Sequence, residues 1–120
     1  MLPKRKKRER MAHKDETVIR VAQHLQFVRG FVCSVWHVTG NIDPCSGNVE
    51  AAHVRTGTDG SMGKKPSDCW AIPLCQTHHR EQHQIGEPAF ERKYGIQMKA
   101  IAASLWDKSI HGKRYRAREK

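Results

Sequence analysis

The residues best suited to chemistry lie between positions 68 and 83, in the run DCWAIPLCQTHHREQH. Cys75 and His78 stand three residues apart after an apolar segment, which is the spacing of one half of a tetrahedral zinc site. His79 and His83 stand four residues apart, so a helix would place both imidazoles on one face, within reach of one cation. Single histidines are commonly ordinary surface residues, but this combination predicts two separate metal sites.

The composition limits the chain to one small, basic domain. We expect a basic disordered tail at residues 1–14, a folded domain at 15–110 and a second basic tail at 111–120. A bound zinc ion is a common source of stability for so small a core. The formal net charge of +10 and the pI near 9.9 favour a polyanionic partner, with nucleic acid the first candidate.

The distribution of apolar residues and cysteines indicates a cellular compartment. The sequence has no apolar run near about 18 residues, and no hydrophobic segment follows the N-terminal charges, so we expect neither a membrane span nor a signal peptide. The prediction is a cytoplasmic protein of a bacterial host, without a membrane partner. Four cysteines in such a setting favour metal ligation over disulfides.

The N-terminal third predicts a helix and an extended segment. Apolar residues recur at steps of three and four from residue 18 to residue 28, which predicts a helix from Asp15 to Gly30. Residues 31–36 then predict a short extended segment that brings Cys33 towards a metal.

The remaining pattern predicts two strands followed by helices. Residues 49–55 and 70–74 have strand character, and a glycine-rich cationic loop joins them. A helix is predicted from 76 to 85, a shorter one from 87 to Gly95, and a further helix whose apolar face packs on the core. The apolar face of that last helix comprises Met98, Ile101, Ala102, Leu105 and Trp106.

In order, these elements form a strand with His53, a long loop, a second strand, and a helix with His79 and His83. The sequence resembles the His-Asn-His (HNH) endonucleases, and more narrowly the phage and prophage subgroup that includes the recombination enhancement function (Ref) nuclease. The resemblance covers roughly residues 25–96 and rests on CSGNVEAAHVR, GTDGSMGKKPSDCWAIPLCQTHHREQH and IGEPAFERKYGI. It implies an α+β fold: a small ββα-metal (HNH) core with a structural zinc site, an N-terminal helix and C-terminal helices.

The resemblance also implies catalytic roles. His53 matches the general base, whose neutral imidazole takes a proton from the attacking water. His79 and His83 match the ligands of a catalytic divalent cation, Mg²⁺, Mn²⁺, Ni²⁺ or Zn²⁺, which stabilises charge on the phosphate and on the leaving 3′-oxygen.

The sequence departs from the family pattern on the first strand. Many relatives carry His-His or Asp-His where this chain has Ala52-His53, so the usual strand ligand is absent. Glu50 lies two residues earlier, on the same strand face as Ala52, and is a candidate substitute, with water as the alternative. Asp68 is predicted to orient the base or tie the loop, in preference to approaching the metal.

The structural zinc requires two ligands besides Cys75 and His78. Cys33 and Cys45 complete the set, and His37 competes for a place because Cys33 and His37 also have workable ligand spacing. The sequence leaves the choice between His37 and Cys45 open. The fourth cysteine, Cys69, is interpreted as a small buried hydrophobe.

Four cations near the site are candidates for phosphate contacts: Arg55, Lys64, Lys65 and Arg80. The favoured function is a metal-dependent DNA endonuclease with little sequence specificity, acting in phage or prophage recombination or DNA processing. DNA is the expected partner, and the resemblance adds a recombinase filament. Two alternatives stay open: a non-catalytic zinc module that binds nucleic acid, and a recombination or packaging accessory protein. The sequence does not predict the oligomeric state.

Overall fold

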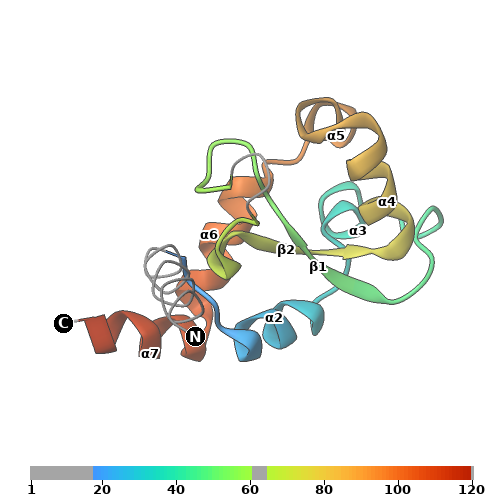
Figure 1. Ribbon diagram of the computed structural model, residues 1–120. Coiled ribbons are helices and arrows are strands. Elements are labelled where there is room, and N and C mark those ends of the chain that lie inside the picture. The colour runs from blue at the N-terminus through green and yellow to red at the C-terminus, as the bar shows by residue number, and fades with distance from the viewer. Residues whose placement is uncertain (1–17, 61–64, 120) are drawn as a thin grey trace, which may run out of the picture.

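A two-stranded antiparallel sheet lies at the centre of the fold, and helices pack around it (Figure 1). The computed structural model describes residues 18–60 and 65–119. The chain is α+β, in agreement with the predicted class. Its elements are α2 (Ala22–Arg29), α3 (Ser34–Thr39), β1 (Val49–His53), the 3₁₀ turn η1 (Asp68–Trp70), β2 (Ala71–Cys75), α4 (Gln76–Ile85), α5 (Glu87–Tyr94), α6 (Met98–Lys108) and α7 (Ile110–Glu119).

The register of the sheet places the end of β1 beside the start of β2. The pairing runs from Val49 opposite Cys75 to His53 opposite Ala71, and every residue of β2 is buried. A short strand buried along its whole length reads as a continuous apolar run, which is what residues 71–75 supply. β1 therefore ends with His53 beside the start of β2, and β2 leads directly into α4.

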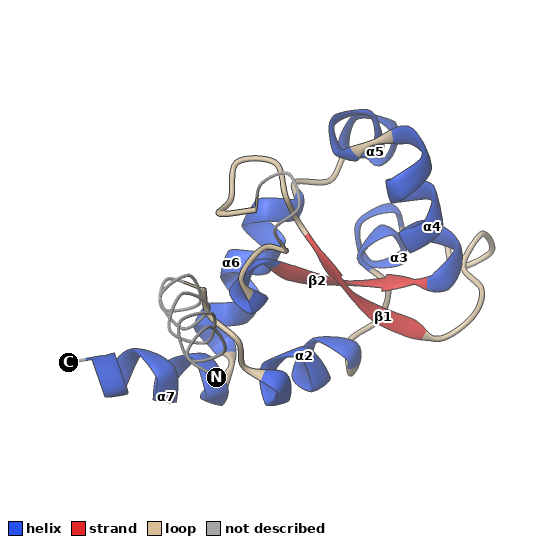
Figure 2. Ribbon diagram, in the orientation of Figure 1, coloured by secondary structure: helices blue, strands red, loops and turns tan. Residues whose placement is uncertain are grey.

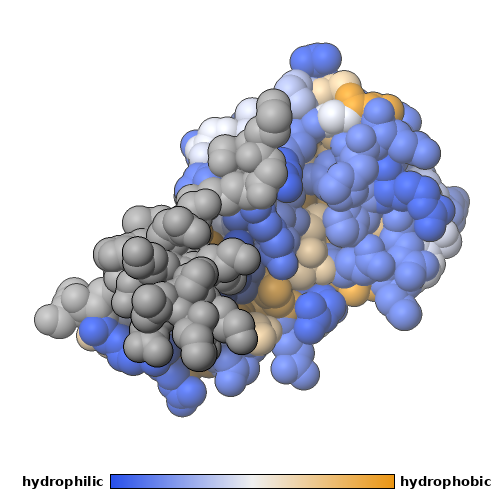
Figure 3. Space-filling model, viewed as in Figure 1, coloured by the Kyte–Doolittle hydropathy of each residue, from blue (hydrophilic) through white to orange (hydrophobic). Residues whose placement is uncertain are grey.

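The helices bury both faces of the sheet. α2 packs on one side, and α3, α4 and α5 lie on the other (Figure 2). The smaller core cluster joins Val28 of α2 to Ala71 and Leu105. The larger cluster gathers residues of the sheet, α3, α5 and α6: Cys33, Val35, Ala52, Val54, Ile72, Leu74, Cys75, Phe90, Ile96, Met98 and Ala102. On the face shown in Figure 3, most of the coloured surface is hydrophilic.

The prediction of an extended segment at residues 31–36 is wrong, because residues 34–39 form α3. The β-branched and aromatic residues there favour a strand locally, but tertiary contacts decide the conformation. Ser34 donates a 2.8 Å hydrogen bond from Oγ to the Pro73 carbonyl oxygen, and Gly40 closes the helix in the left-handed region at φ 75°. Cys33 occupies the N-cap position of the helix without a side-chain capping hydrogen bond, and it still reaches the predicted metal site.

Within the described residues, the helix predicted from Asp15 to Gly30 begins only at Ala22, and residues 15–17 lie outside the described part. Residues 19–21 instead pair with the loop before η1. The Ile19 amide donates to Ser67 Oγ at 2.9 Å, and the Asp68 amide donates to the Ile19 carbonyl at 2.8 Å. These backbone groups are satisfied by a distant loop, which outweighs the helical periodicity of the sequence. The predicted disordered tail at 1–14 lies outside the described residues.

The helical predictions for residues 76–85, 87–94 and 98–108 are confirmed by α4, α5 and α6. The predicted C-terminal tail is different, because residues 110–119 form α7. Gly112 allows this helix to approach α6 closely: a Cβ at that position would lie 2.4 Å from the Trp106 carbonyl oxygen. Docking on Trp106 gives the polar helix a stability that its own sequence would not.

Candidate functional site

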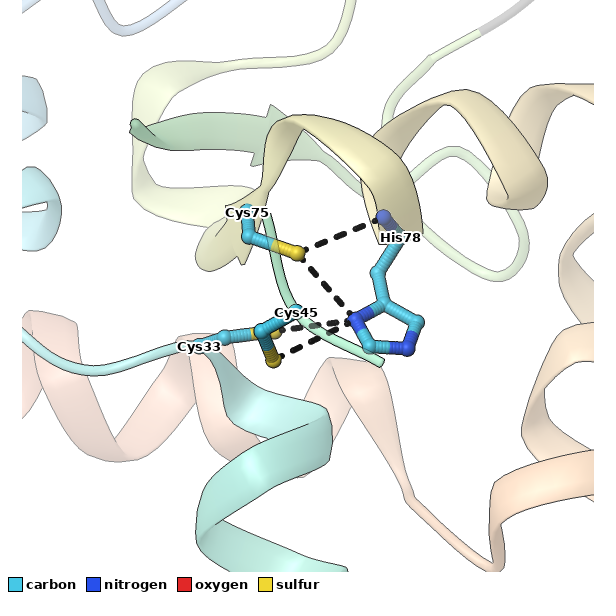
Figure 4. A group of neighbouring side chains, drawn as sticks. All are labelled: Cys33, Cys45, Cys75 and His78. Atoms are coloured by element: carbon cyan, nitrogen blue, oxygen red, sulfur yellow. Dashed lines mark hydrogen bonds between the residues drawn. The ribbon is translucent and has the colours of Figure 1, made fainter. Parts of the chain in front are cut away.

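Three cysteines and one histidine converge on a single point beside the sheet (Figure 4). Cys33 precedes α3, Cys45 lies in the loop before β1, Cys75 ends β2, and His78 lies in the first turn of α4. The four ligand atoms lie within 4.8 Å of one another. They are therefore close enough to bind one metal ion, which would link four segments of the chain.

The distances in this cluster match a tetrahedral site. His78 Nδ1 lies 3.5 Å from Cys33 Sγ, 3.6 Å from Cys45 Sγ and 3.2 Å from Cys75 Sγ. Metal–sulfur bonds of about 2.3 Å and metal–nitrogen bonds of about 2.0 Å at tetrahedral angles separate sulfur from nitrogen by about 3.5 Å. The cysteines form no disulfides, so all three thiols remain able to act as ligands.

Electrostatics affect how this cluster could accept a cation. Burial, together with the nearby Cys33 thiol, raises the pKa of Cys45 to about 12. Burial lowers the pKa of His78, which keeps its imidazole in the neutral form that binds metals. Three thiolates crowded together repel one another, and a divalent cation offsets that repulsion.

The structure separates the two competitors for the fourth position. His37 is exposed on α3 and borders a different pocket with Ala100 and Lys108, so Cys45 and not His37 completes the cluster. Cys69 lies outside the cluster, and burial raises its pKa to about 11. A neutral, half-buried thiol agrees with its interpretation as a small apolar residue.

A second group of polar residues lies at the end of β1. His53 Nε2 lies 3.0 Å from Asp68 Oδ1, so the ring donates its proton to the carboxylate. The other oxygen, Asp68 Oδ2, accepts from the Val21 amide at 2.9 Å. This arrangement fixes the His53 tautomer and leaves Nδ1 as the unprotonated nitrogen. Asp68 thus both orients His53 and ties the loop, the two roles ranked first from the sequence.

The environment of His53 keeps its imidazole neutral near neutral pH. Burial lowers its pKa, and the opposing effect of the Asp68 carboxylate does not cancel that shift. Arg20 lies against the same carboxylate, 3.5 Å from Asp68 Oδ1, and also donates to the Pro66 carbonyl at 2.7 Å. An unprotonated imidazole with a fixed tautomer is the form that accepts a proton from water.

The histidines of α4 form a third group. His79 Nε2 lies 3.3 Å from His83 Nε2, as the predicted helical spacing requires. Two imidazole nitrogens bound to one cation at about 2.1 Å and roughly 100° would lie about 3.2 Å apart. Glu50 Oε1 lies 2.7 Å from His79 Nδ1, so its carboxylate contacts the nitrogen that faces away from His83. The hydrogen bond that Glu50 accepts from His79 lowers the pKa of the Glu50 carboxyl. Desolvation raises this pKa, and charge attraction to His79 lowers it further.

One residue of the second group and one of the third line a pocket of about 280 Å³. His53 and His83 both line it, together with Gln82, Gly86 and Glu87. Glu87 positions the wall of this pocket, because its carboxylate accepts from the amides of Arg55 at 2.8 Å and Thr56 at 2.7 Å. The structure therefore brings the base candidate and a metal-ligand candidate from separate elements to one opening.

Some polar residues of the site were missed by the sequence reasoning. Arg20 carried no signal because it lay within the helix predicted from Asp15 to Gly30, and Glu87 was interpreted as an ordinary first-turn residue. Asp59 accepts hydrogen bonds from the backbone amide and the hydroxyl of Ser67. Both residues lie in the segment between the strands, where the sequence shows no periodicity. Of the predicted phosphate contacts, Arg55, Lys65 and Arg80 are exposed, whereas Lys64 lies outside the described residues.

Comparison with known proteins places the chain in a family. The family described as "Protein of unknown function (DUF968)" matches residues 7–112. The chain belongs to the DUF968 family. This DUF968 protein is also 48% identical over 49 residues to "Uncharacterized protein YdfU" of Escherichia coli strain K12. That match takes in 41% of the chain and only 14% of the relative. The search of solved structures gave no significant match.

The helices of this DUF968 protein were also compared with the length of a membrane span. Within residues 18–60 and 65–119, none of the helices combines the length and apolar character that crossing a bilayer requires.

Proposed function

We propose that this DUF968 protein is a metal-dependent endonuclease of the HNH class that hydrolyses DNA phosphodiester bonds with little sequence specificity. The observation that carries the proposal is the shared pocket: His53, held by Asp68, and His83, paired with His79, open onto it from different elements. The succession β1, β2, α4 supports the same class. The setting we propose is phage or prophage DNA recombination or processing.

In this mechanism His53 acts as the general base. Its Nδ1 takes a proton from a water molecule, whose oxygen then attacks phosphorus in line with the leaving 3′-oxygen. Asp68 accepts from Nε2 throughout and stabilises the imidazolium that forms. The products expected by analogy with HNH enzymes are a 5′-phosphate and a 3′-hydroxyl.

His79 and His83 would hold the catalytic cation through their Nε2 atoms, whose 3.3 Å separation fits shared ligation. Such a cation supplies Lewis-acid stabilisation of the charge that develops on the phosphate and the leaving oxygen. Glu50 fits a supporting role better than direct ligation, because it accepts from His79 Nδ1 and so orients the ring. The position of Ala52, fully buried in the core, supplies no ligand.

The metal of the Cys33, Cys45, Cys75 and His78 cluster is, in this proposal, a structural zinc. Three thiolates and one imidazole form a complete tetrahedral set that leaves no position for water, which is the mark of a structural rather than a catalytic zinc site. The buried sulfur atoms of Cys33 and Cys75 agree with that role.

A non-catalytic zinc module that binds DNA is the second candidate. The observation that favours it is again Ala52: the first strand supplies no direct metal ligand, so the cation rests on two histidines from this chain. An accessory role in recombination, through contact with a recombinase filament, is compatible with either candidate.

Cleavage of supercoiled plasmid tests the proposal. Chelated protein receives Mg²⁺, Mn²⁺, Ni²⁺ or Zn²⁺ in turn, beside His53→Ala, His83→Ala and the control His37→Ala, which changes an exposed histidine outside both sites. We expect cation-dependent cleavage that both site variants lose and the control retains. Binding of DNA without cleavage under any cation would reject the nuclease in favour of the binding module.

A further inference from the structure

The outer face of α7 carries a row of cations. Residues 110, 113, 114, 117 and 118 recur at helical spacing and are all exposed. Three of them are cationic, Lys113, Arg114 and Arg118, and none is acidic. The opposite face is docked: Gly112 is buried against Trp106, and the Tyr115 ring centroid lies 5.9 Å from that of Trp106. Because α7 packs on Trp106 of α6, its three cations face outward.

Three other cations on the chain have internal partners, whereas among the described residues the three on the outer face of α7 do not. Arg20 contacts Asp68, Lys93 pairs with Glu81, and Arg116 lies over the Trp106 ring and 4.0 Å from Asp107. Within the part of the chain that the structure describes, Lys113, Arg114 and Arg118 form no ion pair with an acidic residue. Their charges are directed to solvent.

Helix electrostatics alone do not explain this arrangement. Cations stabilise the last turn of a helix, but Lys113 and Arg114 lie in the first half of α7. Arg114 and Arg118 also stand four residues apart, a spacing at which like charges repel. An external anion would relieve the repulsion between Arg114 and Arg118.

We propose that the outer face of α7 binds the phosphate backbone of double-stranded DNA. Four residues of helix advance about 6 Å, close to the advance of two nucleotides along one strand, so successive arginines can contact phosphates of the same strand. The inference rests on the proposed function for the choice of DNA as ligand, and it adds a binding surface on an element separate from the histidine pocket. Contacts of this kind are independent of base sequence.

Fluorescence anisotropy with a short labelled duplex, measured from 50 to 200 mM salt on the full metal-loaded chain, tests this inference. The variant is Arg114→Gln with Arg118→Gln. The matched control is Arg29→Gln with Arg92→Gln, two exposed cations on α2 and α5 whose loss gives the same net charge. A charge-preserving variant, Arg114→Lys with Arg118→Lys, controls for folding.

Loss of two phosphate contacts lowers the slope of log K against log salt by about 1.8 and weakens binding on the order of 100-fold at 50 mM salt. We expect this result for the α7 glutamine variant only, with the lysine variant close to the parent. An equal loss in the α2/α5 control would show that total charge is responsible and would overturn the inference, as would an unchanged slope in the α7 variant.

The same samples separate this inference from the proposed function. His53→Ala should bind DNA with the parental slope, because it changes the pocket and leaves α7 intact. Cleavage lost in His53→Ala with binding independent of α7 would retain the nuclease and reject the α7 surface. DNA binding that depends on α7, in a protein that never cleaves DNA, would retain the α7 surface and reject the nuclease.

Discussion

Replacing Asp68 with asparagine should convert His53 to the wrong tautomer without removing the side chain from its place. The Val21 amide donates to Asp68 Oδ2 at 2.9 Å, so an asparagine must turn its oxygen towards Val21. Its NH₂ group then faces His53 Nε2, which lies 3.0 Å from the other oxygen in the parent. The opposite orientation would set two donors against each other and leave buried donors unpaired, at about 1–3 kcal/mol.

With NH₂ as the neighbour, Nε2 must accept, and the ring proton moves to Nδ1. The nitrogen proposed to take a proton from water is then already protonated. General-base catalysis typically contributes about 10² to 10⁴ in rate, so we expect Asp68→Asn to lower the cleavage rate by that factor. The buried site, with Asp68 only 3% exposed, should also lose about 1–3 kcal/mol of unfolding free energy.

The assay is the first-order rate of plasmid cleavage at saturating protein from pH 6 to pH 9, about the range over which histidine sites titrate. The rate of Asp68→Asn should stay low at every pH, because a neutral ring with the wrong tautomer is not corrected by base. Nitrogen chemical shifts of the His53 ring report the tautomer directly. The control Asp59→Asn changes a carboxylate of the same loop that accepts from the Ser67 amide at 2.9 Å, and should retain cleavage. A folded Asp68→Asn protein that cleaves within about threefold of the parent, against the factor expected for a lost base, would refute this reasoning.

Three further predictions follow from other parts of the structure. Cys45→Ser should lose the metal proposed for the cysteine cluster and about 3 kcal/mol or more of unfolding free energy, which lowers Tm by about 10 °C or more. The control His37→Ala should keep the parental metal content and Tm. Equal metal content in the two variants would reject the ligand set. Glu50→Gln should weaken binding of the proposed catalytic cation by about 10- to 100-fold in a titration of cleavage against cation, with no change in the metal content of the cysteine cluster. Unaltered cation affinity would remove Glu50 from the proposed site. Burial, with a smaller effect of His111, lowers the pKa of His24 to about 4. Below about pH 6.5 the unfolded chain therefore binds a proton at His24 that the folded chain does not bind. The free energy of unfolding should be full above pH 6.5 and fall by up to about 3 kcal/mol as the pH is lowered to 4. His24→Phe should flatten that part of the denaturation profile, and an unchanged pH dependence would contradict the assignment.

The sequence predicted the elements whose signals are local. Helix α4 was predicted with both of its ends, because Gly86 stops it and because the spacing of His79 and His83 requires helix. The metal cluster could be predicted down to a choice between His37 and Cys45. That choice required the path of the chain, since both residues have workable spacing and only the fold places Cys45 beside Cys33.

The errors in prediction have a common physical cause. Residues 19–21 and 34–39 each form long-range hydrogen bonds, to Ser67 and Asp68 in the first case and from Ser34 to Pro73 in the second. No periodicity in either segment encodes those partners. The polar shell around Asp68 was incomplete for the same reason: Arg20 reaches it across 48 positions of sequence.

The hydrogen bonds between residues 19–21 and the segment Ser67–Asp68, here called the clasp, have a consequence for deletion mapping. The basic block at residues 4–10 invites truncation as a test of its part in nucleic-acid binding. A deletion that extends to residue 21 would also remove the Val21 amide from Asp68 and the Ile19 amide from Ser67, and so release the partner that orients His53. Such a chain would lose the proposed cleavage activity for a reason unrelated to the charge that was deleted. Boundaries that end before residue 18 retain the clasp, and only these truncations separate loss of the basic block from damage to the histidine pocket.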